Sequence, residues 1–197
     1  MIILLGFPKS GTTSFTWLFN MLGMKSYHWV YRNDTDFIGN WMKKMKHKNQ
    51  KLLSFIPKEH YDNCAVTQMD ICMNAKEAYW PQLVDYELLY EQYPDALFIL
   101  NMRDTSDILK SMKKWNKYDE RILKYNPELF NGLHGENDTK ITQLINKHFY
   151  DVKLFFQNKP HAKFITYHIV HDDITKLNKY IDTKGLNFPE VNTNKKK

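Results

Sequence analysis

A short segment near the start of the chain combines glycines, hydroxyl residues and a lysine in a pattern suited to binding an anion. The segment from Gly6 to Ser14 reads GFPKSGTTS, with Lys9 inside it and Gly11 five residues after Gly6. This is the glycine spacing of a phosphate-binding loop, followed by two hydroxyl residues. Inward-facing backbone N–H groups and the positive end of the next helix stabilise a negative charge in such a loop. The spacing therefore predicts a phosphate-binding site.

The position of the lysine separates this loop from the loops of nucleotide hydrolases. Where those loops read Gly-Lys-Ser/Thr, this chain reads Gly11-Thr12-Thr13, and its lysine is Lys9, inside the loop. A lysine at that place still brings a point charge to a phosphate oxygen. A Mg²⁺-dependent enzyme would also need a carboxylate for the metal, and Asp70 is the one candidate that the sequence offers. The less favoured alternative is an ordinary turn before a helix.

The elements expected on either side of the loop are those that a phosphate site needs. Residues 2–5 are all apolar and precede Gly6, which predicts a strand buried on both faces of a parallel sheet. After the loop, four apolar residues recur at helical spacing before Gly23, namely Phe15, Leu18, Phe19 and Leu22. The order of strand, loop and helix therefore supports the phosphate-binding interpretation.

A second cationic residue is expected at the same edge of the sheet. Arg103 directly follows the apolar run 96–102, and Ser111 stands eight residues later in the next predicted helix. Ligands of open α/β folds bind at the carboxyl ends of the strands, and a guanidinium suits a terminal phosphate. The alternative is that Arg103 pairs with Asp104 or Asp107 and serves only to begin the helix.

The rest of the chain alternates between strand and helix signals. Apolar runs predict further strands at 65–69, 96–102 and 163–168. Helical patterns cover 34–46, 81–93, 108–115, 141–157 and 172–183. Residues 27–31 are predicted as a short strand or an irregular wall, and the polar stretch 118–138 as a long excursion. The alternation predicts one α/β domain over 1–190, with a mostly parallel central sheet between layers of helices, and a basic tail over 191–197.

The two motifs together resemble those of the sulfotransferases that use 3′-phosphoadenosine 5′-phosphosulfate (PAPS). The loop sequence of that family, Pro-Lys-Ser-Gly-Thr-Thr, is matched residue for residue from Pro8 to Thr13. Its arginine at the end of a buried strand and its serine eight residues later correspond to Arg103 and Ser111. Residues 93–96 and 171–192 also resemble the family. The resemblance implies a P-loop-type three-layer domain.

The resemblance also implies a set of cofactor-binding residues. The 5′-phosphosulfate of PAPS would lie on the loop, and the 3′-phosphate would contact Arg103 and Ser111. Many members of the family place a tryptophan after the two threonines to stack on adenine, whereas this chain has Ser14 there. Trp17, one turn further on, is either its substitute or a core residue. The implied loop residues are Pro8, Lys9, Ser10, Gly11, Thr12, Thr13 and Ser14.

The reaction implied is transfer of a sulfuryl group from PAPS to an acceptor hydroxyl or amine, with adenosine 3′,5′-bisphosphate as product. Lys9 and the loop amides would stabilise the charge that develops on the leaving phosphate oxygen. No metal is required, because a sulfuryl group carries less negative charge than a phosphoryl group. The acceptor needs a base, and His28 and Asp70 compete for that role. The alternatives are a structural histidine and a helix-capping aspartate.

Composition and charge narrow the class of protein and its partners. The chain has 197 residues, with 43% hydrophobic and 25% charged, which is typical of a globular domain. The net charge of +6 includes three lysines at 195–197, and the remainder is too small to predict nucleic-acid binding. The sequence has no apolar run of membrane-spanning length and no basic leader, and it has only two cysteines. We therefore expect a cytoplasmic protein, as a monomer or homodimer, without nucleic-acid or membrane partners. The resemblance implies a small-molecule or glycan acceptor.

Two other functions remain open from the sequence. One is a nucleotide or nucleoside kinase with an altered phosphate loop, which would bind ATP and need Mg²⁺ near Thr13. The displaced Lys9 and the pair Arg103 and Ser111 argue against it. The other is a non-catalytic descendant of the sulfotransferase fold that binds a nucleotide without turning it over.

Overall fold

The computed structural model describes residues 1–32 and 35–190 and has a five-stranded, fully parallel sheet at its centre. The strand order is β2-β3-β1-β6-β7, which places the first strand in the middle. The strands are β1 (Ile2–Leu4), β2 (Lys25–His28), β3 (Cys64–Gln68), β6 (Leu97–Met102) and β7 (Lys163–His168). The predicted α/β class and single domain are confirmed. The predicted tail over 191–197 and the first residue of the helix predicted at 34–46 lie outside the described residues.

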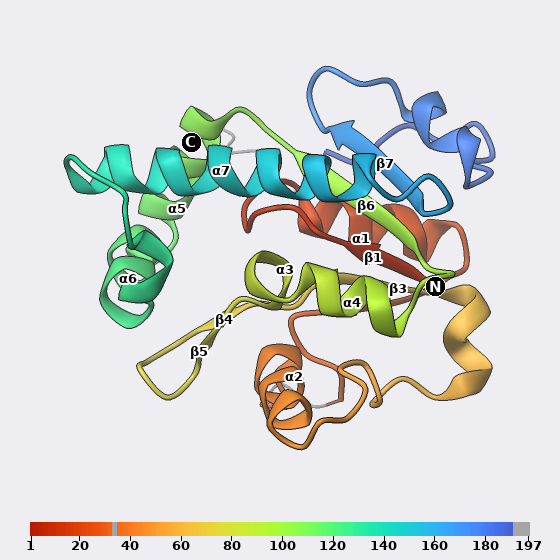
Figure 1. Cartoon of the computed structure of the whole chain (residues 1–197). Coiled ribbons are helices and arrows are strands. Elements are labelled where there is room, and N and C mark those ends of the chain that lie inside the picture. Colours follow the sequence, from red (N-terminus) through yellow and green to blue (C-terminus); the bar gives the residue numbers. More distant parts are fainter. Residues whose placement is uncertain (33–34, 191–197) are drawn as a thin grey trace.

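Two apolar layers enclose the sheet, because successive residues of the central strands point to opposite faces. On one face, Ile3 and Phe98 pack with the long helix α7 (Asn137–Gln157). On the other face, Ile2 and Ile99 pack with α1 (Thr12–Met21). Figure 1 shows α7 lying across the front of the sheet and α1 behind it. The layers follow from the apolar runs that predicted these strands.

The remaining helices surround this framework. They are α2 (Ile38–His47), α3 (Pro81–Val84), α4 (Tyr86–Gln92), α5 (Thr105–Lys114) and α6 (Tyr118–Tyr125), with 3-10 helices η1 (Lys58–Asn63), η2 (Pro127–Phe130) and η3 (Ile174–Lys179). Within the part of the chain that the structure describes, none of the helices has the length and apolar character needed to cross a bilayer.

Several predicted elements differ from those observed. The helix predicted over 81–93 is broken at Asp85, whose buried carboxylate binds Lys46 and the hydroxyl of Tyr79. The final helix is only the short η3. The excursion predicted over 118–138 contains α6, which buries Tyr118 and Ile122. A two-stranded antiparallel hairpin, β4 (Ile71–Cys72) with β5 (Ala78–Tyr79), was not predicted, because its strands are too short to show a pattern.

The edge strand β2 was harder to predict than the other strands of the main sheet. The strand or wall predicted at 27–31 is β2, which begins two residues earlier at Lys25 and ends at His28. Only Tyr27 of its four residues is buried. An edge strand has one neighbour and part of its surface in water, so its residues need not form an apolar run.

Candidate functional site

The loop after β1 (residues 6–11) is held in place by hydrogen bonds to Asn101, a buried residue of β6. The Oδ1 atom of Asn101 accepts a hydrogen bond from the Gly6 amide at 2.9 Å. Its Nδ2 atom donates to the Ser10 hydroxyl at 2.7 Å and to the Ser10 carbonyl at 3.1 Å. A side chain at Gly6 would put its Cβ 2.2 Å from the Asn101 carbonyl oxygen, so only glycine fits. Asn101 was not predicted as a site residue, because no pattern in a single sequence indicates this contact.

The backbone of the loop is bent by two left-handed residues. Lys9 has φ of 72° and Gly11 has φ of 89°. For Lys9 this conformation costs about 1 to 2 kcal/mol, so the surrounding contacts must stabilise it. Ser10 between them is fully buried, and its amide donates to the Phe7 carbonyl at 3.1 Å. Ile169, just after β7, would lie 2.9 Å from a Cβ at Gly11, so β7 also supports the loop.

A small cavity of about 100 Å³ lies against the loop, and residues from distant parts of the chain line it. Its volume is below the roughly 300–1,000 Å³ of sites that enclose a whole small ligand, so it would hold only the charged groups of a larger molecule. The lining residues are Lys9, Gly11, Thr12, Thr13, Ser14, Gln68, Arg103 and Ser111. The structure thus places Arg103 and Ser111 in one cavity with the loop. Pro8 and Ser10 do not line it, and Gln68 was not predicted.

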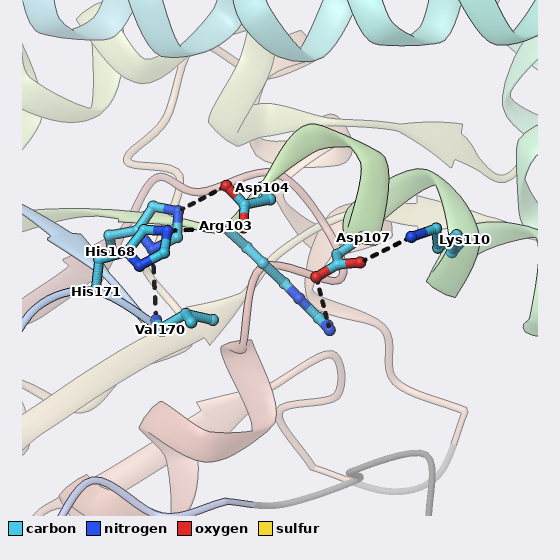
Figure 2. Close-up of polar contacts among 7 residues, drawn as sticks. All are labelled: Arg103, Asp104, Asp107, Lys110, His168, Val170 and His171. Atoms are coloured by element: carbon cyan, nitrogen blue, oxygen red, sulfur yellow. Dashed lines mark hydrogen bonds and ion pairs between the residues drawn. The ribbon is translucent and has the colours of Figure 1, made fainter. Parts of the chain in front are cut away.

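The two cations of the cavity are held by different neighbours. The Lys9 ammonium lies 3.7 Å from the ring centroid of Trp115. Burial lowers the pKa of Lys9 to about 8, with an opposing effect from Asp70. The Arg103 guanidinium makes a long ion pair with Asp107, with 3.9 Å between Nη2 and Oδ2. Figure 2 shows the Arg103 side chain extending toward Asp107.

Arg103 retains a donor that no residue in the described part of the chain satisfies. Its Nε atom is buried and has no hydrogen-bond partner there. A buried, unpaired guanidinium nitrogen costs free energy unless an acceptor is supplied. An oxyanion in the adjacent cavity would supply one. The cavity therefore combines a cationic lining with unsatisfied hydrogen-bonding capacity.

Comparison with known proteins identifies the family of the chain. A family model described as a sulfotransferase domain matches residues 1–196. The chain belongs to the sulfotransferase-domain family. No curated protein matches it. The resemblance inferred from Pro8–Thr13, Arg103 and Ser111 is therefore confirmed at the level of the family.

His28 lies at the end of β2 in this sulfotransferase domain, beside two threonines. Its Nδ1 atom is 3.1 Å from the Thr16 hydroxyl and 3.0 Å from the Thr67 hydroxyl. Burial and, to a lesser extent, the charge of Lys9 lower the pKa of His28 to about 4. The imidazole is therefore neutral near pH 7.

The hydroxyl network determines which ring nitrogen of His28 carries the proton. Thr16 can donate to the Thr12 carbonyl at 2.9 Å, and Thr67 can donate to the Tyr27 carbonyl at 3.2 Å. The two hydroxyls also lie 2.7 Å apart. The two threonine hydroxyls have one proton each, and both protons are used in these contacts, so neither hydroxyl donates to Nδ1. The network is best satisfied when Nδ1 is the donor, which leaves Nε2 with a lone pair.

Asp70, the second predicted base, occupies a different environment. It lies between β3 and β4, so it caps no helix. Its buried carboxylate accepts hydrogen bonds from Tyr118, from Gln82 at 3.2 Å and from Gln68 at 3.4 Å. Burial raises the pKa of Asp70. The side chain is not among those that line the cavity.

Trp17 is not a core residue of the sulfotransferase domain. Its side chain is 55% exposed on α1, one turn beyond Ser14, which lines the cavity. Of the two expectations for Trp17, burial in the core is wrong. An exposed indole on this helix can stack on a planar ligand.

Proposed function

We propose that this domain transfers a sulfuryl group from PAPS to a hydroxyl or amine of a small-molecule or glycan acceptor. The observation that carries the proposal is the single cavity in which Lys9 and residues 11–14 lie together with Arg103 and Ser111. These are the residues that the family resemblance assigns to opposite ends of one nucleotide. Membership of the sulfotransferase-domain family supports transferase chemistry in general.

Chemical fit supports PAPS as the donor. The amides of Thr12 and Thr13 open α1, and the first N–H groups of a helix have no carbonyl within it to bind. They would hold the 5′-phosphosulfate. The unpaired Nε of Arg103 and the Ser111 hydroxyl would hold the 3′-phosphate. When bound, PAPS supplies an activated sulfuryl group, and the released product is adenosine 3′,5′-bisphosphate.

Lys9 has the properties of the group that stabilises the leaving phosphate. Its left-handed backbone directs it from the loop into the cavity lining, and its pKa of about 8 leaves it mostly protonated at pH 7. A fixed cation beside the oxygen that gains charge lowers the barrier without reorganisation of water. Because the sulfuryl group carries little negative charge, the proposed step requires no metal.

His28 is the better candidate for the general base. When Nδ1 is the donor to the threonine hydroxyls, Nε2 keeps the lone pair that a base needs. Neither side chain lines the cavity, but the Asp70 carboxylate already accepts three hydrogen bonds. We therefore assign proton removal from the acceptor to His28 and a structural role to Asp70.

The kinase alternative is less well supported. Among the described residues that line the cavity there is no carboxylate to hold Mg²⁺ beside Thr13. Asp70, the sequence candidate, points its carboxylate at Tyr118, Gln82 and Gln68 instead.

A cytoplasmic location stays part of the proposal, and the free, buried cysteines Cys64 and Cys72 support it.

Transfer of radiolabelled sulfuryl from PAPS to a panel of hydroxyl and amine acceptors tests the function. We expect a labelled product with the native chain and almost none with Lys9→Ala. Parallel reactions with ATP and Mg²⁺ should give no phosphorylated product. Phosphoryl transfer would favour the kinase, and tight PAPS binding without turnover across the panel would favour the non-catalytic alternative.

A further inference from the structure

Two histidines and an aspartate converge beside the cavity without a role in the proposed transfer. His168 is the last residue of β7, His171 is in the turn that follows it, and Asp104 lies between β6 and α5. The Nε2 atoms of His168 and His171 are each 3.7 Å from an oxygen of Asp104. One potential ligand atom from each residue lies within 4.8 Å of the others. Figure 2 shows the two rings and Asp104 on one side of Arg103.

We propose that Asp104, His168 and His171 form a binding site for a divalent transition-metal ion, with Zn²⁺ as the best match. Imidazole and carboxylate are ligands that suit zinc, and three protein ligands with a water molecule complete its tetrahedron. In a tetrahedral site with bonds of about 2.1 Å, the ligand atoms lie about 3.4 Å apart. The observed spacing therefore needs movements on the order of an ångström.

The turn that carries the histidines is held in place independently of any ion. Asp172 accepts a hydrogen bond from the His168 amide at 2.7 Å, and its own amide donates to the His168 carbonyl at 3.0 Å. The Ile169 amide donates to the Met102 carbonyl at 3.0 Å, which ties the turn to β6. These contacts place the two rings 4.3 Å apart and nearly parallel. The histidines are thus largely oriented before a metal arrives.

Asp104 is oriented toward the histidines and not toward its helix. It occupies the N-cap position of α5, where an aspartate usually accepts a hydrogen bond from a helix amide. No such bond is present at α5. Its side chain is 52% exposed, so a water ligand can reach the ion. Of the two histidines, His168 is the more enclosed, with 18% of its side chain exposed against 64% for His171.

One existing contact must change when the ion binds. The Val170 amide donates to Nδ1 of His168 at 3.4 Å, a long hydrogen bond. Coordination through Nε2 leaves the ring proton on Nδ1, so this amide loses its acceptor. Val170 is in the exposed turn, so water can replace that contact. The adjustment lowers affinity without blocking the site.

The ion would connect the ends of two strands that support the nucleotide cavity. Asp104 directly follows Arg103, and Ile169, between the histidines, packs against Gly11 of the loop. A metal at this site fixes β7 to β6 without entering the transfer step. The inference rests on the cluster alone and does not depend on the donor or the acceptor.

Calorimetric titration of the chelator-treated, full-length protein with ZnCl₂ tests the proposal. We expect one ion per chain, and His171→Ala should weaken binding by at least about tenfold, since losing even an outer partner of a ligand costs that much. Asp104→Asn, which keeps the side-chain shape, should weaken it similarly. His171 is 64% exposed, so its variant should fold normally, as circular dichroism can verify.

The control is His161→Ala, another exposed histidine, which precedes β7 at its opposite end. This variant should bind Zn²⁺ as the native chain does. Absence of saturable binding, or equal affinity in the native chain, His171→Ala and Asp104→Asn, would overturn the proposal. Loss of binding in His161→Ala alone would move the site elsewhere and also overturn it.

Discussion

At the scale of single residues, the site depends on an unusual lysine. Lys9 is held over Trp115 in a left-handed conformation, and burial brings its pKa down to about 8. A lysine at its ordinary pKa would stay charged throughout the range in which most enzymes are assayed. Here the charge that we propose stabilises the leaving group is lost within that range.

The pH dependence of turnover follows from this shift. The protonated form of Lys9 is the active one, so kcat/KM should fall as the pH rises through about 8. In Lys9→Arg the guanidinium stays charged, and the fall near pH 8 should disappear even if the rate is lower. The measurement is kcat/KM for PAPS between pH 6 and about 10. A native profile that stays flat through pH 8 would contradict the role of Lys9.

The choice of base is tested by a pair of substitutions. His28→Ala should lower kcat by about 10²- to 10⁴-fold, because the acceptor loses the group that takes its proton. Nucleotide affinity should change little, since His28 is not among the cavity-lining residues. Asp70→Asn should lower the free energy of unfolding, because Asp70 is buried in a hydrogen-bond network. The reverse pattern, with turnover lost only in Asp70→Asn, would exchange the two assignments.

At the scale of elements, the loop after β1 depends on β6, a strand that lies far away in chain order but next to β1 in the sheet. Asn101 of β6 binds the amide of Gly6 and both oxygens of Ser10, so β6 fixes the loop that follows β1. The two strands are neighbours in the sheet, with Leu4 opposite Ile99. The loop is therefore shaped before a ligand binds.

Removal of the contacts of Asn101 with the loop should lower the free energy of unfolding. Asn101→Ala leaves the buried Gly6 amide without its acceptor, which costs about 1–3 kcal/mol in the free energy of unfolding. Urea denaturation followed by circular dichroism measures the change. The matched control is Asn158→Ala, where an exposed asparagine bonds only the Leu154 carbonyl, and we expect little change. Equal effects of the two substitutions would show that Asn101 has no special role.

The elements that the sequence predicted well are those whose residues carry their own signal. The strand at 2–5, the loop and Arg103 were recognisable because apolar runs and glycine spacing are local patterns. Asn101 and Gln68 were not, because their roles depend on contacts with residues far away in the chain. The break at Asp85 was missed for the same reason, since Lys46 and Tyr79 hold that carboxylate.

At the scale of the whole molecule, the parallel sheet concentrates the site at one edge. The loop after β1, Gln68 at the end of β3 and Arg103 just after β6 come from three adjacent strands. A ligand that contacts all three would hold the central strands together at their carboxyl ends. Binding should therefore be linked to global stability.

Adenosine 3′,5′-bisphosphate should raise the melting temperature of the chain. At a concentration of 100 times its dissociation constant, binding to the native state alone adds about 2.7 kcal/mol. Thermal unfolding with and without the nucleotide measures the shift, and Arg103→Ala should reduce it at a fixed concentration. An unchanged melting temperature at saturating nucleotide would contradict a site built across these strands.

We propose that the loop and Arg103 bind the two charged ends of one 3′-phosphorylated nucleotide. Calorimetry comparing adenosine 3′,5′-bisphosphate with AMP tests it most directly. We predict that the bisphosphate binds at least about tenfold more tightly in the native chain, because a charged hydrogen bond contributes about 1.5–3 kcal/mol. In Arg103→Ala the two affinities should become similar. Equal affinity for the two nucleotides in the native chain would contradict the account.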